Sequence, residues 1–171
     1  MQFQDKIRRP FNSTLSNIPE GAAGIKVTLK AMSNLVKAYK SALAIRTLSV
    51  QIVSGFAQKD YKGEVQALQQ WVRDRIRYVK DVRDVETLQT PEVTLRVRSG
   101  DCDDKSTLLA SLLESIGHET RFIAIGFQPG EFDHVYVESR IGAIWVPLET
   151  TEPVNMGWQP SGIKARMIQG N

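Results

Sequence analysis

The stretch Ser99–Gly117, "SGDCDDKSTLLASLLESIG", decides the fold, because it joins a complete set of helix signals to the only cysteine in the chain. Asp101 is a natural N-cap, and the acids that follow it suit the positive end of a helix dipole. Gly117 stands where a C′ glycine ends a helix. One face carries the apolar side chains Leu108, Leu109, Leu112, Leu113 and Ile116. The pattern predicts a buried helix that starts at or beside Cys102.

Downstream of this helix the pattern indicates three short strands, at Thr120–Phe127, His134–Arg140 and Ile144–Glu149. The segments "QPGEFD" and "IGA" that separate them can form the connections. The second strand alternates, so that His134, Tyr136 and Glu138 share one face. We expect an antiparallel meander packed on the Cys102 helix. The remaining tail, 150–171, has little periodicity, and we expect it to wrap the surface.

Upstream of the cysteine the pattern is helical. Apolar residues recur at helical spacing from Gly24 to about Gly55, which fits two helices or one kinked helix, and a further helix begins near Gly63. Residues 79–100 are expected to form a long loop with short extended or helical pieces. The class is therefore α+β, with N-terminal helices followed by a core helix that carries the cysteine and packs on a small antiparallel sheet.

This pattern divides the chain into three parts. Residues 1–22 carry prolines and a glycine and are expected to form an extended N-terminal arm. Residues 23–62 form a helical N-terminal region. Residues 63–171 form the main core, including the C-terminal tail.

Composition limits the classes of function. The 171 residues are 42% hydrophobic and 24% charged, as in an ordinary soluble domain. A net charge of +3 is too small to indicate nucleic-acid binding. No apolar run approaches the roughly 20 residues of a membrane span, and the N-terminus does not resemble a signal peptide. A single cysteine excludes an intramolecular disulfide, so we expect a cytoplasmic protein.

Three residues form a pattern that can carry chemistry: Cys102 at a helix start, His134 at the start of one strand and Glu149 at the end of the next. If the two strands form a hairpin, Glu149 can accept the imidazole N–H of His134 and fix its tautomer. The other ring nitrogen can then take the proton of the thiol. A helix N-terminus also favours the thiolate and offers N–H groups to an oxyanion.

Structural roles compete with this interpretation, because a lone cysteine is often a small buried hydrophobe and a lone histidine is often part of a core. Zinc binding is disfavoured, since two further good ligands are missing and the only other histidine, His118, lies at the far end of the helix. The aromatic residues Trp71, Tyr78, Tyr136 and Trp145 can line a cleft, but core packing is the simpler expectation for each.

The segments "SGDCDDKSTLLASLLESIGHETRFIAIGF", "FDHVYVES" and "WVPLETT", with "LQQWVRDRIRYVKD" upstream, resemble the transglutaminase-like superfamily, a papain-like group. The resemblance covers about residues 63–152. It implies that Cys102 is the nucleophile and His134 the base, with Glu149 in the place of the usual aspartate. Glutamate is one methylene longer, so its contact with His134 needs a small adjustment of backbone or rotamer.

The acids around the cysteine look like two subgroups: bacterial transglutaminase-like cysteine proteinases, which depend on calcium, and small transglutaminase-like proteins of phages and prophages. Three carboxylates beside Cys102 oppose the thiolate. A Ca²⁺ ion held by Asp101, Asp103 and Asp104 would offset that effect. The alternative is that these acids only cap the helix, and no cofactor is then required.

The resemblance implies an amide hydrolase of the peptidase or isopeptidase type, acting on a protein or peptide substrate through an acyl-thioester on Cys102. The alternative is a phage or prophage structural or assembly protein that keeps the fold without catalysis, with particle or tail components as partners. Neither reading involves nucleic acid or a membrane.

Overall fold

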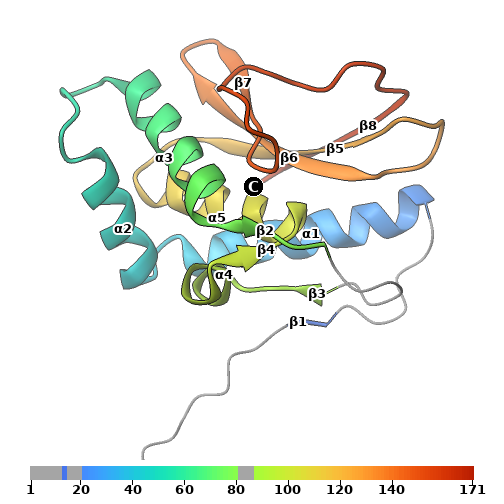
Figure 1. Cartoon of the computed structure of the whole chain (residues 1–171), viewed down its shortest axis with the longest axis horizontal. Coiled ribbons are helices and arrows are strands. Elements are labelled where there is room, and N and C mark those ends of the chain that lie inside the picture. Colours follow the sequence, from blue (N-terminus) through green and yellow to red (C-terminus); the bar gives the residue numbers. More distant parts are fainter. Residues whose placement is uncertain (1–12, 15–20, 81–86) are drawn as a thin grey trace, which may run out of the picture.

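The computed structural model describes residues 13–14, 21–80 and 87–171 (Figure 1). The helices are α1 (Gly21–Tyr39), α2 (Leu43–Val53), α3 (Tyr61–Arg75), α4 (Pro91–Val97) and α5 (Cys102–Ser115). The strands are β1 (Ser13–Thr14), β2 (Arg77–Tyr78), β3 (Thr87–Leu88), β4 (Ser99–Gly100), β5 (Thr120–Gly126), β6 (His134–Ile141), β7 (Ile144–Leu148) and β8 (Ala165–Gly170). The expected arm at 1–22 falls mostly outside the described residues. The α+β class is confirmed.

Helix α5 is the centre of the molecule, and its ends form as the sequence predicts. The Asp101 carboxylate accepts the N–H groups of Asp103 and Asp104, and the Asp104 carboxylate accepts the Asp101 N–H, which completes a capping box. At the other end Gly117 has a φ of 99°, a conformation that favours glycine. The helix contacts α1, α2, α3, α4 and strand β6 (Figure 1).

The expected meander is present as part of a four-stranded antiparallel sheet with the order β7-β6-β5-β8. Residues Val135 and Val137 of β6 point to the helices and join the main core. Their neighbour Tyr136 points to the opposite face, where it packs with Ile123 and Ile125. This alternation matches the faces predicted from the sequence.

The main core lies between the sheet and the helices. It includes Leu108, Leu109, Leu112 and Leu113 of α5, which are all fully buried. Each such leucine stabilises the fold by about 2 kcal/mol through removal of apolar surface from water. Residues of α1, α2 and α3 pack into the same core, so the N-terminal helices are continuous with the rest of the domain.

The expectation for the C-terminal tail was wrong in one respect, because its last residues form β8 and pair antiparallel with β5. In this edge strand Ile168 is exposed while Met167 packs on the core. An exposed isoleucine on the outer side hides the alternation on which a strand prediction depends. The sheet therefore has four strands, and Ile163, just before β8, packs on the cluster of its outer face.

The described residues before the cysteine, 87–100, contain short extended and helical pieces, as expected: β3, α4 and β4. Thr90 caps α4 through its side chain and Pro91 occupies the first turn, where its missing N–H costs nothing. Strand β4 then pairs in parallel with β2 and leads directly into Asp101. Within the described residues, no helix combines the length and apolar character that crossing a bilayer requires.

Candidate active site

Cys102 is the first residue of α5 and sits against the beginning of strand β6. Its sulfur accepts a hydrogen bond from the backbone N–H of Val135, the residue that follows His134. One turn further along α5, the Ser106 hydroxyl donates to the Val135 carbonyl at 3.2 Å. These two contacts bring the helix start and the strand start together, so the thiol lies beside the residue expected to act as its base.

His134 and Glu149 are in direct contact, with 2.6 Å between His134 Nε2 and Glu149 Oε2. His134 is the first residue of β6, and Glu149 directly follows β7, whose Leu148 pairs antiparallel with Val137 of β6. The contact expected from the strand pattern is therefore present. It occupies Nε2 and leaves Nδ1 as the ring nitrogen for an exchange of protons with another group.

The carboxylate of Glu149 is buried and held on both oxygens. Oε1 accepts the backbone N–H of Thr150 at 2.8 Å, the N–H of Thr151 at 2.6 Å and the Thr151 hydroxyl at 2.8 Å. Burial raises the pKa of this carboxyl, but the bond and charge of His134 and the donors of Thr151 outweigh burial and lower it. Glu149 is thus an anion fixed in one orientation near neutral pH.

The thiol of Cys102 is in an environment that opposes ionisation. Burial, followed by the negative charges of Asp103 and Asp101, raises the pKa of Cys102 well above its ordinary value. The Val135 N–H acts in the opposite direction and is weaker. Cys102 Sγ also lies 3.5 Å from Asp103 Oδ1. The dipole of α5 therefore does not produce a resting thiolate, and the thiol needs a base to lose its proton.

A pocket of about 330 Å³ opens beside His134 and Glu149. Its walls come from β2 and from the segment after β7, with the aromatic residues Tyr78, Phe127 and Trp158 among them. Of the four aromatic residues considered from sequence, Tyr78 lines this pocket. Trp158 was missed because it lies in a tail without periodicity, and Phe127 because it was taken as the last residue of a strand.

The other aromatic residues from the sequence analysis pack elsewhere. Tyr136 belongs to the buried cluster on the outer face of the sheet. The rings of Trp71 and Trp145 are covered by guanidinium groups, those of Arg98 at 5.0 Å and Arg121 at 4.2 Å. Tyr136 and Trp71 pack on the buried clusters, as the simpler expectation stated, whereas Trp145 is half-buried and belongs to neither cluster.

The acids expected to bind calcium point in different directions. The Asp101 carboxylate is directed at the first-turn N–H groups of α5. Asp104 is buried and accepts the backbone N–H of Gln89 at 2.7 Å and its side-chain amide at 2.8 Å. Across residues 21–80 and 87–171, no three His, Cys, Asp or Glu side chains gather as they would around a metal ion. Asp101 and Asp104 thus take part in helix capping, and calcium binding by these acids stays a prediction.

The first-turn N–H groups also limit the expected oxyanion site. Those of Asp103 and Asp104 already donate to the Asp101 side chain. Any oxyanion binding at this helix start therefore falls to the N–H of Cys102 and to groups outside the helix. What the arrangement offers chemically is a thiol, an imidazole whose far nitrogen is held by a carboxylate, and an adjacent pocket.

Two solved structures share the fold. A "putative protease" from Parabacteroides distasonis aligns over 81% of this chain and 31% of its own, with a TM-score of 0.61 and 12% identity. A "putative cysteine protease" from Cytophaga hutchinsonii aligns over 82% of this chain and 52% of its own, with a TM-score of 0.55 and 18% identity. The chain thus spans about a third and about half of these proteins. No curated protein matches it.

The sequence model of the transglutaminase-like superfamily matches residues 46–150, which include Cys102, His134 and Glu149. The match begins within α2, earlier than the segment on which the resemblance was noticed. None of these comparisons bears on the expected closeness to phage and prophage proteins, which stays a prediction. Because the matched region covers more than half of the chain, the protein belongs to the transglutaminase-like superfamily.

Proposed function

We propose that the protein is a cysteine-dependent amide hydrolase, with Cys102 as nucleophile, His134 as base and Glu149 as the residue that orients the base. The contact of 2.6 Å between His134 Nε2 and Glu149 Oε2, at the strand start that touches Cys102, carries this proposal. The family membership supports it, as do the descriptions of both structural neighbours as proteases.

In this reaction, His134 Nδ1 takes the proton of the Cys102 thiol while sulfur attacks the amide carbonyl. Collapse of the tetrahedral intermediate breaks the C–N bond, and the imidazolium returns the proton to the departing amine. Water, deprotonated by His134, then hydrolyses the thioester and restores the thiol. The raised pKa of Cys102 suits proton transfer during attack, because little thiolate is present beforehand.

The pocket supports a protein or peptide as substrate. Aromatic walls beside the His134–Glu149 pair can bury an apolar side chain next to the scissile amide. The segment after β7 lines this pocket through Thr151, Glu152 and Val154, so it would contact the substrate as well as the base.

The reactivity of the thiol tests the proposal without a known substrate. We expect iodoacetamide to modify Cys102 rapidly and stoichiometrically near neutral pH, as measured by intact mass. The rate should fall at least about 100-fold in His134→Ala, since general-base catalysis supplies roughly that factor or more. Cys102→Ala is the control for labelling elsewhere. Equal rates in the wild type and in His134→Ala would refute the assignment.

A non-catalytic assembly protein with this fold is the second candidate. The observation that favours it is the position of Asp103 and Asp101, whose negative charges raise the pKa of the thiol that catalysis would use. Slow labelling that is insensitive to His134 is the result expected for this candidate, so the same experiment separates the two.

A further inference from the structure

We propose that Gln69 and Arg73, on helix α3, are positioning residues that hold segment 149–154 and thereby keep the Glu149 carboxylate against His134. The inference deepens the proposed function and rests on it for the role of the pair. It concerns contacts between α3 and main-chain carbonyl groups, which lie behind the carboxylate and do not touch the pair itself.

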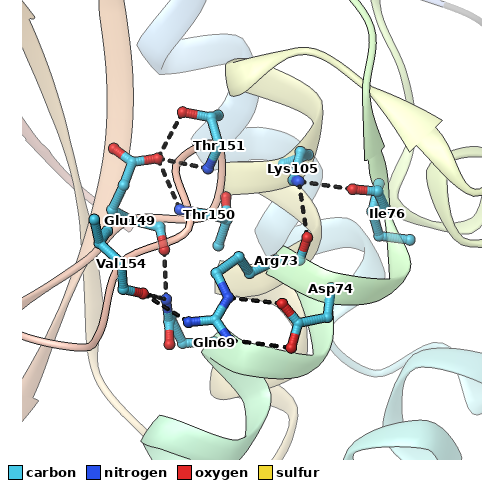
Figure 2. A network of polar contacts seen from close by, with 9 residues as sticks. All are labelled: Gln69, Arg73, Asp74, Ile76, Lys105, Glu149, Thr150, Thr151 and Val154. Carbon is cyan, nitrogen blue, oxygen red and sulfur yellow. Dashed lines mark hydrogen bonds and ion pairs between the residues drawn. The ribbon is translucent and has the colours of Figure 1, made fainter.

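The contacts are short and reach both ends of the segment (Figure 2). Gln69 Nε2 donates to the carbonyl of Glu149 at 2.5 Å and to the carbonyl of Val154 at 3.3 Å. Arg73 Nη1 donates to the same Val154 carbonyl at 2.7 Å. Two residues one turn apart on α3 thus fix the first and last carbonyl groups of the segment.

The amide of Gln69 lies where an apolar side chain would ordinarily be expected. The residue is fully buried, between Leu68 and Val72 of the same helix, which belong to the main core. Burying an amide costs free energy unless hydrogen bonds compensate it, and its two donor bonds both go to segment 149–154. Besides packing, the side chain of Gln69 therefore supplies hydrogen-bond donors to segment 149–154.

Arg73 is held in place from its other side. Its guanidinium makes two contacts with Asp74, at 2.7 Å from Nε and 3.1 Å from Nη2, so it meets the Val154 carbonyl in one orientation. Thr151, Glu152 and Val154 line the pocket. Gln69 and Arg73 consequently fix one wall of the pocket together with the carboxylate.

Helix α3 is itself tied to the helix that presents the nucleophile. The buried Lys105 of α5, three residues after Cys102, donates to the carbonyl of Ile76 at 2.7 Å and lies 3.5 Å from that of Arg73. A cation at the C-terminal end of a helix is favourable for the helix dipole. The contacts therefore run from α5 through the end of α3 to the segment that carries Glu149 (Figure 2).

The variant that tests the inference is Gln69→Met, which keeps the length of the side chain and removes the donors. The readout is the Nε2–H signal of ¹⁵N-labelled histidine. The chain has two histidines, and His118 Nε2 lies 2.9 Å from Glu64 Oε2, so its signal is an internal control. Ser49→Ala is a matched control, since the Ser49 hydroxyl is buried and bonds to the far end of α5 at Leu112.

We expect Gln69→Met to lose or broaden the His134 signal and to keep that of His118, while Ser49→Ala keeps both. Alkylation of Cys102 should slow by about 10-fold to 100-fold in Gln69→Met only, as for a small misplacement of a catalytic group. An unchanged His134 signal would overturn the inference. If Gln69→Met does not fold, Arg73→Met removes the less buried partner, and the same comparison of the two histidines decides.

The two proposals can fail separately. Alkylation that does not depend on His134 in the wild type would remove the proposed catalysis, while the histidine spectra would still decide whether Gln69 positions Glu149. Conversely, a His134-dependent rate with an unchanged His134 signal in Gln69→Met and Arg73→Met would keep the catalysis and remove the positioning role.

Discussion

The substitution Glu149→Gln tests the separate roles of the two carboxylate oxygens in orienting His134, because it keeps the size of the side chain and removes its charge. In the wild type, Oε1 accepts three hydrogen bonds from Thr150 and Thr151, and Oε2 contacts His134. A glutamine has one acceptor oxygen and one donor NH₂ group. It can satisfy the loop or act as an acceptor for His134, but it cannot do both.

The loop decides the orientation of the new amide. Turning NH₂ toward Thr150 and Thr151 would place donors against donors, at about 1–3 kcal/mol for each buried group left without a partner. Three such groups outweigh the single bond to His134. The glutamine oxygen therefore stays with the loop, and its NH₂ group faces His134 Nε2. The imidazole must then accept at Nε2 and carry its proton on Nδ1, where it cannot take the thiol proton.

We expect Glu149→Gln to slow the alkylation of Cys102 near neutral pH by about 100-fold to 10,000-fold, which is the range of general-base catalysis. The histidine spectrum should show the inverted tautomer of His134 and an unchanged His118. A wild-type rate in Glu149→Gln, or an unchanged tautomer together with a reduced rate, would refute this reasoning. A wild-type rate would mean that Glu149 does not contribute to the reactivity of Cys102. An unchanged tautomer with a reduced rate would mean that the substitution acts through the fold and not through His134.

Two further predictions concern charge. Asp103 raises the pKa of Cys102 by its charge and by its contact with the thiol, so Asp103→Asn should move the thiolate absorbance and the alkylation profile to lower pH. Burial lowers the pKa of Lys105 to about 8, below the 10.5 of an exposed lysine. The unfolded chain therefore binds more protons between these values, and stability rises with pH. Relative to Lys105→Met, the wild type should gain about 2 kcal/mol in chemical denaturation between about pH 7 and about pH 9.5; a constant difference would contradict this.

Residues with local signals were predictable from the sequence. The cap at Asp101, the glycine at Gly117 and the leucine stripe between them define α5, because each acts within a few residues. The strand pattern put His134 and Glu149 at adjacent ends of two neighbouring strands, and their contact follows from the pairing of those strands. These signals were enough for the fold class and for the proposed catalytic set.

What sequence could not provide depends on contacts between distant segments. Gln69 and Glu149 are 80 positions apart and meet through a main-chain carbonyl, which leaves no trace in residue type. The two hydrogen bonds from Gln89 to the oxygens of Asp104 join residues 15 positions apart and could not be read from the sequence. Lys105 looks like a solvated residue of a polar helix start, yet it is buried against the end of α3.

The length of Glu149 is explained by the strand geometry. The last paired position of β6 and β7 joins Val137 to Leu148, so the backbone of Glu149 lies one step beyond it, nearer to Tyr136 than to His134. Reaching His134 means spanning the diagonal between strands, which is about 7–8 Å between backbone positions. The extra methylene of glutamate helps to cover this diagonal while Oε1 stays with Thr150 and Thr151. Thr150 and Thr151 thus fix the longer side chain of Glu149 in the orientation that reaches His134. Because Gln69 donates to the Glu149 carbonyl, its hydrogen bond also helps to determine how the carboxylate meets His134.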